Sequence, residues 1–221
     1  MLKRKELQTI YRRLHNTYGP QHWWPADSAF EVMVGAVLTQ NTAWKNVEQA
    51  IANLRRNDCL DLQRLLSLSP RKLAGMITPS GYFNIKAKRL RNLCLWLAAE
   101  GGIRELAQRD TGSLRSALLS VKGVGPETAD AILLYACARP VFVIDVYTRR
   151  LFNRLGLIAG TESYETLRGY FETALPADVP LYNEYHALIV RHAKERCAVT
   201  RQCRHCVVEK PLKAAKVKRE A

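Results

Sequence analysis

One carboxylate of the chain is placed to do chemistry: Asp145 directly follows the apolar run at residues 141–144. An aspartate at the start of a helix is a good N-cap, because its side chain accepts hydrogen bonds from unpaired backbone N–H groups. Helix capping alone would explain why an aspartate stands at position 145. Capping would also hold the carboxylate rigid and ionised, and these are the properties of a catalytic group.

The segment before Asp145 predicts two amphipathic helices joined by the turn Gly123-Val124-Gly125, since apolar residues recur at helical spacing on both sides. Without Cβ atoms, both glycines can adopt positive φ and let the backbone approach a partner closely, and Pro126 suits the first helical position. Backbone N–H groups that point outward from such a turn attract a phosphate. An ordinary helical hairpin explains the same residues, and a glycine pair does not separate the two interpretations.

Aromatic residues mark a second candidate site. Trp23 and Trp24 precede Pro25 in a segment without helical periodicity, and Trp44 follows after the next predicted helix. Indole faces stack on flat ligands and attract cationic ones. Packing at the edge of the core explains these tryptophans equally well, since Trp is usually largely buried.

The elements that position these groups are predicted to be helical throughout. Helical periodicity or capping signals mark segments at 1–19, 30–38, 69–81, 90–97, 164–175 and 181–194. Asn41 or Thr42 is the expected cap of the helix that carries Trp44. A basic surface is expected from Lys86, Lys88, Arg89 and Arg91. His186 and His192 are interpreted as packing histidines, because they are not spaced as a metal pair.

Composition limits the class of protein. Of the 221 residues, 48% are hydrophobic, and the 34 Lys and Arg residues exceed the 20 Asp and Glu residues, which gives a net charge of +14. This charge indicates a polyanionic partner, and nucleic acid is favoured over an acidic membrane surface. The chain has no signal peptide and no apolar run of about 20 residues. We therefore expect a soluble cytoplasmic protein that works at the nucleoid of a bacterial cytosol.

Four segments together resemble the endonuclease III superfamily of helix-hairpin-helix DNA glycosylases: VKGVGPETADAILLYACARPVFVIDVYTRRL at 121–151, GAVLTQNT at 35–42, SGYFNIKAKRL at 80–90 and HALIVRHAKERC at 186–197. The resemblance implies an all-α, two-lobed fold with the active site in the interlobe cleft. Residues 22–130 would form the central bundle, and 1–21 with 131–221 the second lobe.

The resemblance also implies roles for particular residues. Asp145 would be the catalytic aspartate, and Gln40 would enter the duplex in place of the flipped base, although an exposed loop glutamine is the simpler interpretation. Trp44 would line the base pocket or belong to the core. The remaining implied contacts are Trp23, Trp24 and Pro25 to the base, and Lys122, Gly123, Val124 and Gly125 to DNA.

Glu127 departs from the bifunctional members, which have a lysine nucleophile at this position. A carboxylate cannot form a Schiff base with an opened sugar. Glu127 together with Trp23-Trp24-Pro25 resembles the bacterial 3-methyladenine branch, so we expect a monofunctional glycosylase for alkylated purines, with Glu127 helping Asp145 in catalysis. Lys122 is either a substitute nucleophile or a phosphate contact. The rival hypotheses are a bifunctional enzyme for oxidised pyrimidines and a noncatalytic DNA-binding module.

Three cysteines near the end of the sequence, Cys197, Cys203 and Cys206, resemble the [4Fe-4S] loop of endonuclease III. That loop uses four cysteines, and Leu212 stands at the expected fourth position. Two alternatives follow for this segment: it binds an iron–sulfur cluster with an incomplete set of cysteine ligands, or it binds no cluster and is held by packing alone. The partner expected from the resemblance is double-stranded DNA with a damaged base, bound by a monomer and without a membrane.

Overall fold

The computed structural model describes residues 2–197 and 206–208, and this part of the chain is helical without a β-strand. Its residue contacts divide the chain into two compact units. Unit 1 combines Met1–Trp23 with Pro140–Ala221, and unit 2 is the continuous segment Trp24–Arg139. The all-α expectation is therefore confirmed for the described residues. No helix among them is both long and apolar enough to span a membrane.

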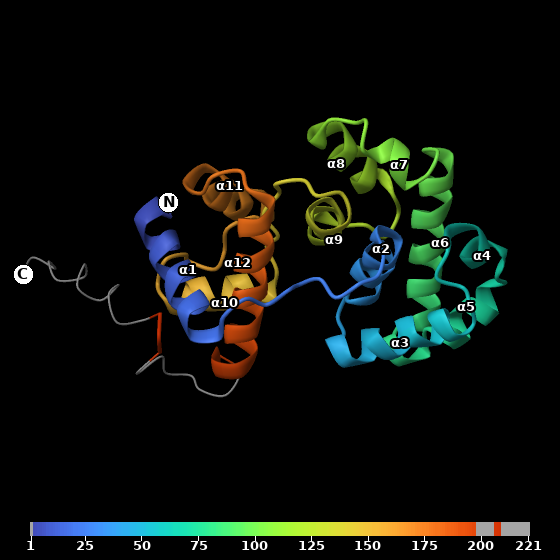
Figure 1. Cartoon of the computed structure of the whole chain (residues 1–221), viewed down its shortest axis with the longest axis horizontal. Helices are drawn as coiled ribbons and strands as arrows, with labels where there is room; N and C mark the ends of the chain where they lie inside the picture. Colours follow the sequence, from blue (N-terminus) through green and yellow to red (C-terminus); the bar gives the residue numbers. More distant parts are fainter. Residues whose placement is uncertain (1, 198–205, 209–221) are drawn as a thin grey trace, which may run out of the picture. The chain divides into compact units, whose positions relative to one another are not determined.

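Unit 2 is built on the helix α2 (Figure 1), in which every residue from Phe30 to Leu38 is buried. The apolar run from Phe30 to Leu38 has no polar face, so α3, α6, α9 and η2 surround it. Its one charged residue, Glu31, receives two hydrogen bonds of 2.8 Å from the guanidinium of Arg55, which compensates the burial of the carboxylate. The elements of unit 2 are α2 (Ala29–Leu38), α3 (Trp44–Arg56), α4 (Leu62–Ser67), α5 (Pro70–Met76), the 3₁₀-helix η1 (Thr78–Ser80), α6 (Phe83–Ala99), α7 (Ile103–Leu106), α8 (Thr111–Ser120), α9 (Pro126–Ala131) and the π-helix η2 (Ile132–Ala136).

Unit 1 pairs the amino-terminal helix with the last helices of the chain (Figure 1). The ring of Phe142 stacks on Phe171 at 4.2 Å between centroids, and the buried Tyr185 donates a hydrogen bond of 2.9 Å to the carbonyl of Leu7. These contacts join the segment before Asp145 to the helix that carries Phe171, and the helix that carries Tyr185 to the amino-terminal helix. The elements of unit 1 are α1 (Arg4–Tyr18), α10 (Val146–Arg154), α11 (Tyr164–Ala174), α12 (Val179–His192) and the π-helix η3 (Ala193–Cys197).

Two local expectations were wrong. The residue that precedes α3 is Ala43, which has no capping side chain, so neither Asn41 nor Thr42 caps this helix. Lys86 does not belong to the basic surface: it is 1% exposed, and its ammonium group donates to the carbonyls of Leu38 at 2.8 Å and Ser80 at 2.7 Å. Its long apolar stem allows the side chain to cross the core and cap the end of α2 from inside.

Candidate nucleic-acid and base-binding site

The hairpin between α8 and α9 depends on a glycine at position 123. Gly123 has φ +103°, and a Cβ atom there would lie 2.3 Å from Cγ of Arg89. Both the backbone conformation and the packed arginine stem therefore exclude a side chain. Gly125 does not use the positive φ that a glycine allows: it is extended, with φ −98° and ψ 179° and open space around it.

The backbone amides of the turn differ in their availability. The Val124 N–H donates to the carbonyl of Val121 at 3.0 Å, which closes the turn. Within the described part of the chain, no hydrogen bond occupies the N–H of Gly123 or Gly125. These two amides thus remain able to bind an anion, while the side chain of Val124 is buried and anchors the turn.

Gln40 is tied to the hairpin and is not a freely exposed loop residue. Its side-chain amide donates to the carbonyl of Gly123 at 3.1 Å and to the hydroxyl of Thr128 at 2.9 Å, across a separation of more than 80 residues. The guanidinium of Arg89 donates to the Gln40 carbonyl oxygen. The loop after α2, the helix α6 and the hairpin are therefore held as one structure.

An internal ion pair fixes the two helices of the hairpin. Arg115 of α8 binds both carboxylate oxygens of Asp130, which is fully buried in α9, at 2.6 and 3.1 Å. A bidentate arginine–carboxylate contact sets direction as well as distance. The orientation of the turn is consequently set from within unit 2.

The predicted aromatic residues of unit 2 gather on one side of α2. The ring of Trp24 lies at 5.1 Å and 88° from Trp44, and at 5.2 Å from Tyr135 of η2. Trp24 approaches α2 at Gly35, where an added Cβ would be 2.9 Å from the indole carbon Cζ2. The glycine therefore provides the space in which the indole sits. Trp23, a half-buried residue, ends the amino-terminal segment of unit 1.

A hollow of about 460 Å³ opens beside Trp24, Pro25 and Trp44. Three carboxylates line it, and the guanidinium of Arg55 binds two of them, Asp27 at 2.7 Å and Glu31 at 2.8 Å. The third carboxylate, Glu48, accepts a hydrogen bond of 2.8 Å from the indole N–H of Trp44. Three negative groups against one positive group make the lining attractive to a cation.

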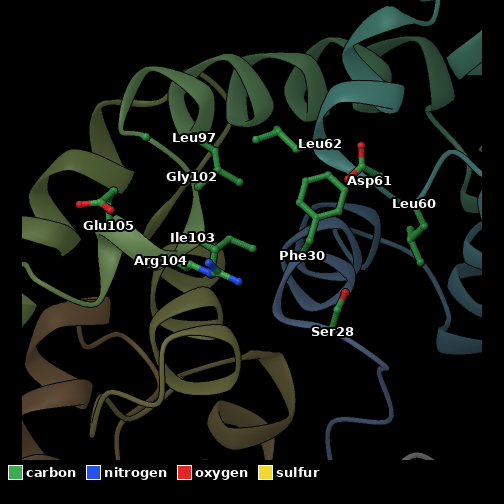
Figure 2. A pocket seen from close by; sticks show the side chains of 11 residues that line it. Ser28, Phe30, Leu60, Asp61, Leu62, Leu97, Gly102, Ile103, Arg104 and Glu105 are labelled. Atoms are coloured by element: carbon green, nitrogen blue, oxygen red, sulfur yellow. The ribbon is translucent and has the colours of Figure 1, made fainter.

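A second hollow, of about 550 Å³, lies elsewhere in unit 2 and contains none of the predicted site residues. Figure 2 shows the Phe30 ring at its wall, with Leu97 and Ile103 around the same space. Asp61, on its rim, caps α4 by accepting from the amides of Gln63 and Arg64. This hollow combines apolar walls with the charged residues Arg104 and Glu105, and it lies apart from the predicted hairpin and tryptophan residues.

The carboxylate of Asp145 stands at the head of α10 in unit 1. It caps this helix as expected, since Oδ1 accepts a hydrogen bond of 2.7 Å from the Thr148 amide. The segment before it, residues 141–144, is buried as expected. Side chains of α11 hold its backbone: Glu172 accepts from the Phe142 amide at 2.9 Å, and Tyr164 from the Ile144 amide at 3.4 Å.

Asp145 is buried and nevertheless held in its charged form. Burial by itself would raise the pKa of this carboxyl, but the charge of His186 and the hydrogen bonds from Thr148 outweigh burial and lower the pKa below its usual value. The Nε2 atom of His186 lies 3.5 Å from Oδ2 of Asp145. The group is therefore a carboxylate, not a carboxylic acid, at neutral pH.

These features agree with the result of comparing the chain with known families. The model of the HhH-GPD superfamily base excision DNA repair proteins matches residues 34–177, which is more than half of the chain and includes both the hairpin and Asp145. The chain belongs to this superfamily. It is accordingly a DNA N-glycosylase of base excision repair.

Individual HhH-GPD relatives cover nearly the whole chain. A protein of Methanocaldococcus jannaschii named "Putative DNA repair glycosylase MJ1434" is 48% identical over 203 residues, which is 90% of this chain and 92% of the relative. The structure of the H. pylori 3-methyladenine DNA glycosylase (MagIII) bound to 1,N6-ethenoadenine has a TM-score of 0.74 at 31% identity, covering 87% of this chain and 98% of that one. A non-covalent endonuclease III–DNA complex has a TM-score of 0.79 at 18% identity over 97% and 95% of the two chains, which shows the shared fold.

The structure places the remaining predicted residues of this HhH-GPD chain on exposed surface. Glu127 is exposed in the first turn of α9, directly after Pro126. Lys122 is exposed in the turn, and its carbonyl accepts a hydrogen bond of 2.9 Å from Asn92 of α6. Both side chains are therefore accessible to a ligand at the hairpin.

Two of the three cysteines of the predicted iron–sulfur loop lie among the described residues. Cys197 is buried at the end of η3, and the thiol of Cys206 lies 3.2 Å from Nε2 of His192. Cys203 and Leu212 fall outside the described residues. No group of three metal-binding side chains occurs among residues 2–197 and 206–208. The [4Fe-4S] cluster stays a prediction.

Three residues near the candidate site were missed from the sequence. His186 is one of them: its neighbours in α12 are apolar and buried, a pattern that should have indicated a partner for the imidazole. Glu48 stands four residues after Trp44, the spacing at which helical side chains meet. Tyr135 had no such signal, because its contact with Trp24 depends on tertiary structure. His192 is a packing histidine as predicted, and its Nδ1 atom is 2.9 Å from the Tyr18 hydroxyl.

Proposed function

We propose that this HhH-GPD protein is a monofunctional glycosylase that removes a positively charged alkylated purine, such as 3-methyladenine, by hydrolysing its N-glycosidic bond. The observation that carries the proposal is the hollow beside Trp24 and Trp44, which combines indole faces with an excess of carboxylates. A flat cation gains both stacking and cation–π attraction at such a surface. A neutral, undamaged base gains only the stacking.

The carboxylate of Glu48, through its Oε1 atom, would strengthen this preference. It does not need to touch the base, because it accepts the N–H of Trp44 and so adds negative charge at the indole ring. Trp24, held against Gly35 and Tyr135, would supply a rigid second face, and Pro25 the adjoining edge. Trp23 is assigned to the base on the sequence resemblance alone. Rigid aromatic walls recognise an extruded base at little entropic cost.

Asp145 is the proposed catalytic residue. An alkylated purine already carries positive charge, so it leaves without strong help from a general acid. A carboxylate that is ionised and fixed by Thr148 can then stabilise the oxocarbenium character of the sugar and orient the attacking water. Glu127 occupies the position of the lysine nucleophile of bifunctional members, and we assign it to orienting water near the hairpin.

The hairpin is the proposed anchor for the DNA backbone. The N–H groups of Gly123 and Gly125 would bind a phosphate, with Lys122 beside them to neutralise charge. Val124 keeps its amide within the turn and would contribute by anchoring it. Insertion of Gln40 into the duplex requires exchange of its hydrogen bonds to Gly123 and Thr128 for bonds to the orphaned base.

The substrate is tested with a panel of duplexes, each with a single lesion: 3-methyladenine or 7-methylguanine as cationic bases, and 1,N6-ethenoadenine, 5-hydroxycytosine or thymine glycol as neutral ones. We expect release of the cationic purines without strand scission and without a covalent adduct on borohydride reduction. Release of the oxidised pyrimidines with a trapped adduct would instead establish the bifunctional alternative. Binding without release of any base would establish the noncatalytic module.

Asp145→Asn tests the catalytic assignment directly. The amide keeps the shape of the side chain but cannot stabilise a cation, so base release should fall by about 10²–10³-fold while DNA affinity changes little. The measurement is single-turnover release with saturating enzyme, together with fluorescence anisotropy on the same duplex. Release at the wild-type rate would remove Asp145 from the mechanism.

Three further expectations accompany this proposal. The protein acts as a monomer on double-stranded DNA that contains a damaged base, which light scattering of the free and bound protein measures. It works in the cytoplasm at the nucleoid, which imaging of a fluorescent fusion locates. The [4Fe-4S] cluster implied by Cys197, Cys203 and Cys206 stays a prediction, and iron and sulfide analysis of anaerobically purified protein decides it.

A further inference from the structure

The carboxylate of Asp145 has a titratable neighbour from a different helix. His186 lies in the middle of α12, and its Nε2 atom is 3.5 Å from Oδ2 of Asp145. Both residues are buried, with 7% and 8% of their surface exposed. A charge is costly to bury unless an opposite charge or a donor accompanies it, so the two groups compensate each other.

The two oxygens of Asp145 are held by different elements. The Thr148 amide of α10 binds Oδ1 at 2.7 Å, and His186 of α12 faces Oδ2. One contact alone would leave the carboxyl free to rotate about its Cβ–Cγ bond. Contacts from two helices fix its plane, and preorganised charge of this kind needs no rearrangement during reaction.

We propose that His186 is the positioning residue of Asp145: it holds the second carboxylate oxygen at the head of α10 and keeps the buried group in its charged form. The inference rests on the proposed function, in which a neutral Asp145 could not stabilise a cationic sugar. His186 would not touch the substrate, and its effect would reach the reaction through Asp145.

Other charged groups on the packed elements are engaged elsewhere in the described residues. The helix α10 packs against α12 and η3, and Tyr164 of α11 contacts the backbone just before Asp145. Their charged groups have the following partners: Arg149 with the Glu162 carbonyl, Arg150 and Lys194 over the Tyr147 ring, Glu184 with the Gln21 amide, Glu195 with Arg191, and Arg196 with Tyr18.

The test is the pH dependence of single-turnover base release in wild type and in His186→Gln. Glutamine keeps a neutral donor but cannot carry the charge of an imidazole, so only the hydrogen bonds from Thr148 then oppose the rise in the pKa of Asp145 that burial causes. A carboxylate with an opposite charge within about 4–6 Å has its pKa lowered by about 1–3 units, so the acidic limb of the variant should move up by about that many pH units. The rate at the alkaline plateau should change much less.

His15→Gln is the matched control, because His15 belongs to α1 and its ring faces Tyr11 at 5.8 Å and not Asp145. Its acidic limb should coincide with that of wild type. The melting temperature of His186→Gln shows whether this variant is folded. If it is folded and the acidic limb of its pH–rate profile coincides with that of wild type, the inference is overturned. If His186→Gln does not fold, ¹³C NMR of aspartate-labelled wild type replaces it. The carboxyl signal of Asp145 is identified as the one missing from the spectrum of Asp145→Asn. The inference requires that this signal titrate at a pH below the usual range of aspartate.

The two proposals fail in different ways. Full activity of Asp145→Asn removes the proposed catalytic role whatever His186 does. If Asp145→Asn is inactive but the acidic limb of His186→Gln is not shifted, the glycosylase mechanism stands and only the positioning role of His186 is removed.

Discussion

Gly123→Ala is the substitution whose effect the structure predicts most directly. The alanine must adopt φ +103°, which costs about 1–2 kcal/mol for a residue with a Cβ. Its Cβ would also be 2.3 Å from Cγ and 3.0 Å from Cβ of Arg89, and overpacking of this kind costs about 1–3 kcal/mol. The free energy of unfolding should therefore fall by about 2–5 kcal/mol, as the sum of the two costs.

Gly125→Ala is the matched control in the same turn. Gly125 is extended, and no atom lies within 4 Å of an added Cβ. Alanine at a compatible position stabilises by about 0.4–1 kcal/mol, because it restricts the unfolded chain. The new methyl group would stand where a phosphate approaches, so DNA affinity should fall by about 1.5 kcal/mol, roughly tenfold in Kd.

Urea unfolding and fluorescence anisotropy with an undamaged duplex measure the two effects separately. Gly123→Ala should lose stability together with affinity, and Gly125→Ala should lose affinity alone. The reasoning is refuted if Gly123→Ala unfolds within about 0.5 kcal/mol of wild type, the range of a neutral surface change. Unchanged DNA affinity of Gly125→Ala would remove the phosphate from this turn.

Two other substitutions probe the interior of unit 2. Gly35→Ala places a Cβ 2.9 Å from Trp24, so the indole must move. Overpacking should lower the free energy of unfolding by about 1–3 kcal/mol, and release of a cationic lesion by the folded variant should fall through KM. An unchanged KM would separate Trp24 from base binding. Burial, with a smaller effect of Arg89, lowers the pKa of Lys86 to about 8. Between about pH 8 and 10.5 the unfolded chain then binds more protons at Lys86, so the stability of wild type relative to Lys86→Met should rise with pH by at most about 3 kcal/mol. A difference independent of pH would show that Lys86 titrates normally.

Much of the fold was predictable because it depends on local patterns. The apolar run at 30–38 has no polar face, so it had to be buried, and Asp145 directly after a buried segment had to cap the next helix. The family followed from motifs spread along the chain. A glycine hairpin or an aspartate alone is common in proteins, but the two at a fixed separation indicate this family. Capping of α3 failed as a prediction because several residues of one loop could have served.

Other features depended on contacts between residues that are distant in the sequence. The sequence predicts a surface position for Lys86, but the packing of α6 places its ammonium group against the carbonyls of Leu38 and Ser80. Gln40 reads as a loop residue, although the hairpin binds its amide. The charge state of Asp145 likewise depends on His186 from another helix.

The sequence by itself determined the helices, the glycine turn and the family, because these follow from periodicity, backbone conformation and motif spacing. The tertiary structure alone decided which side chains compensate one another. A buried charge or amide must find its partner in space, and the helix that supplies this partner is set by packing and not by position along the chain.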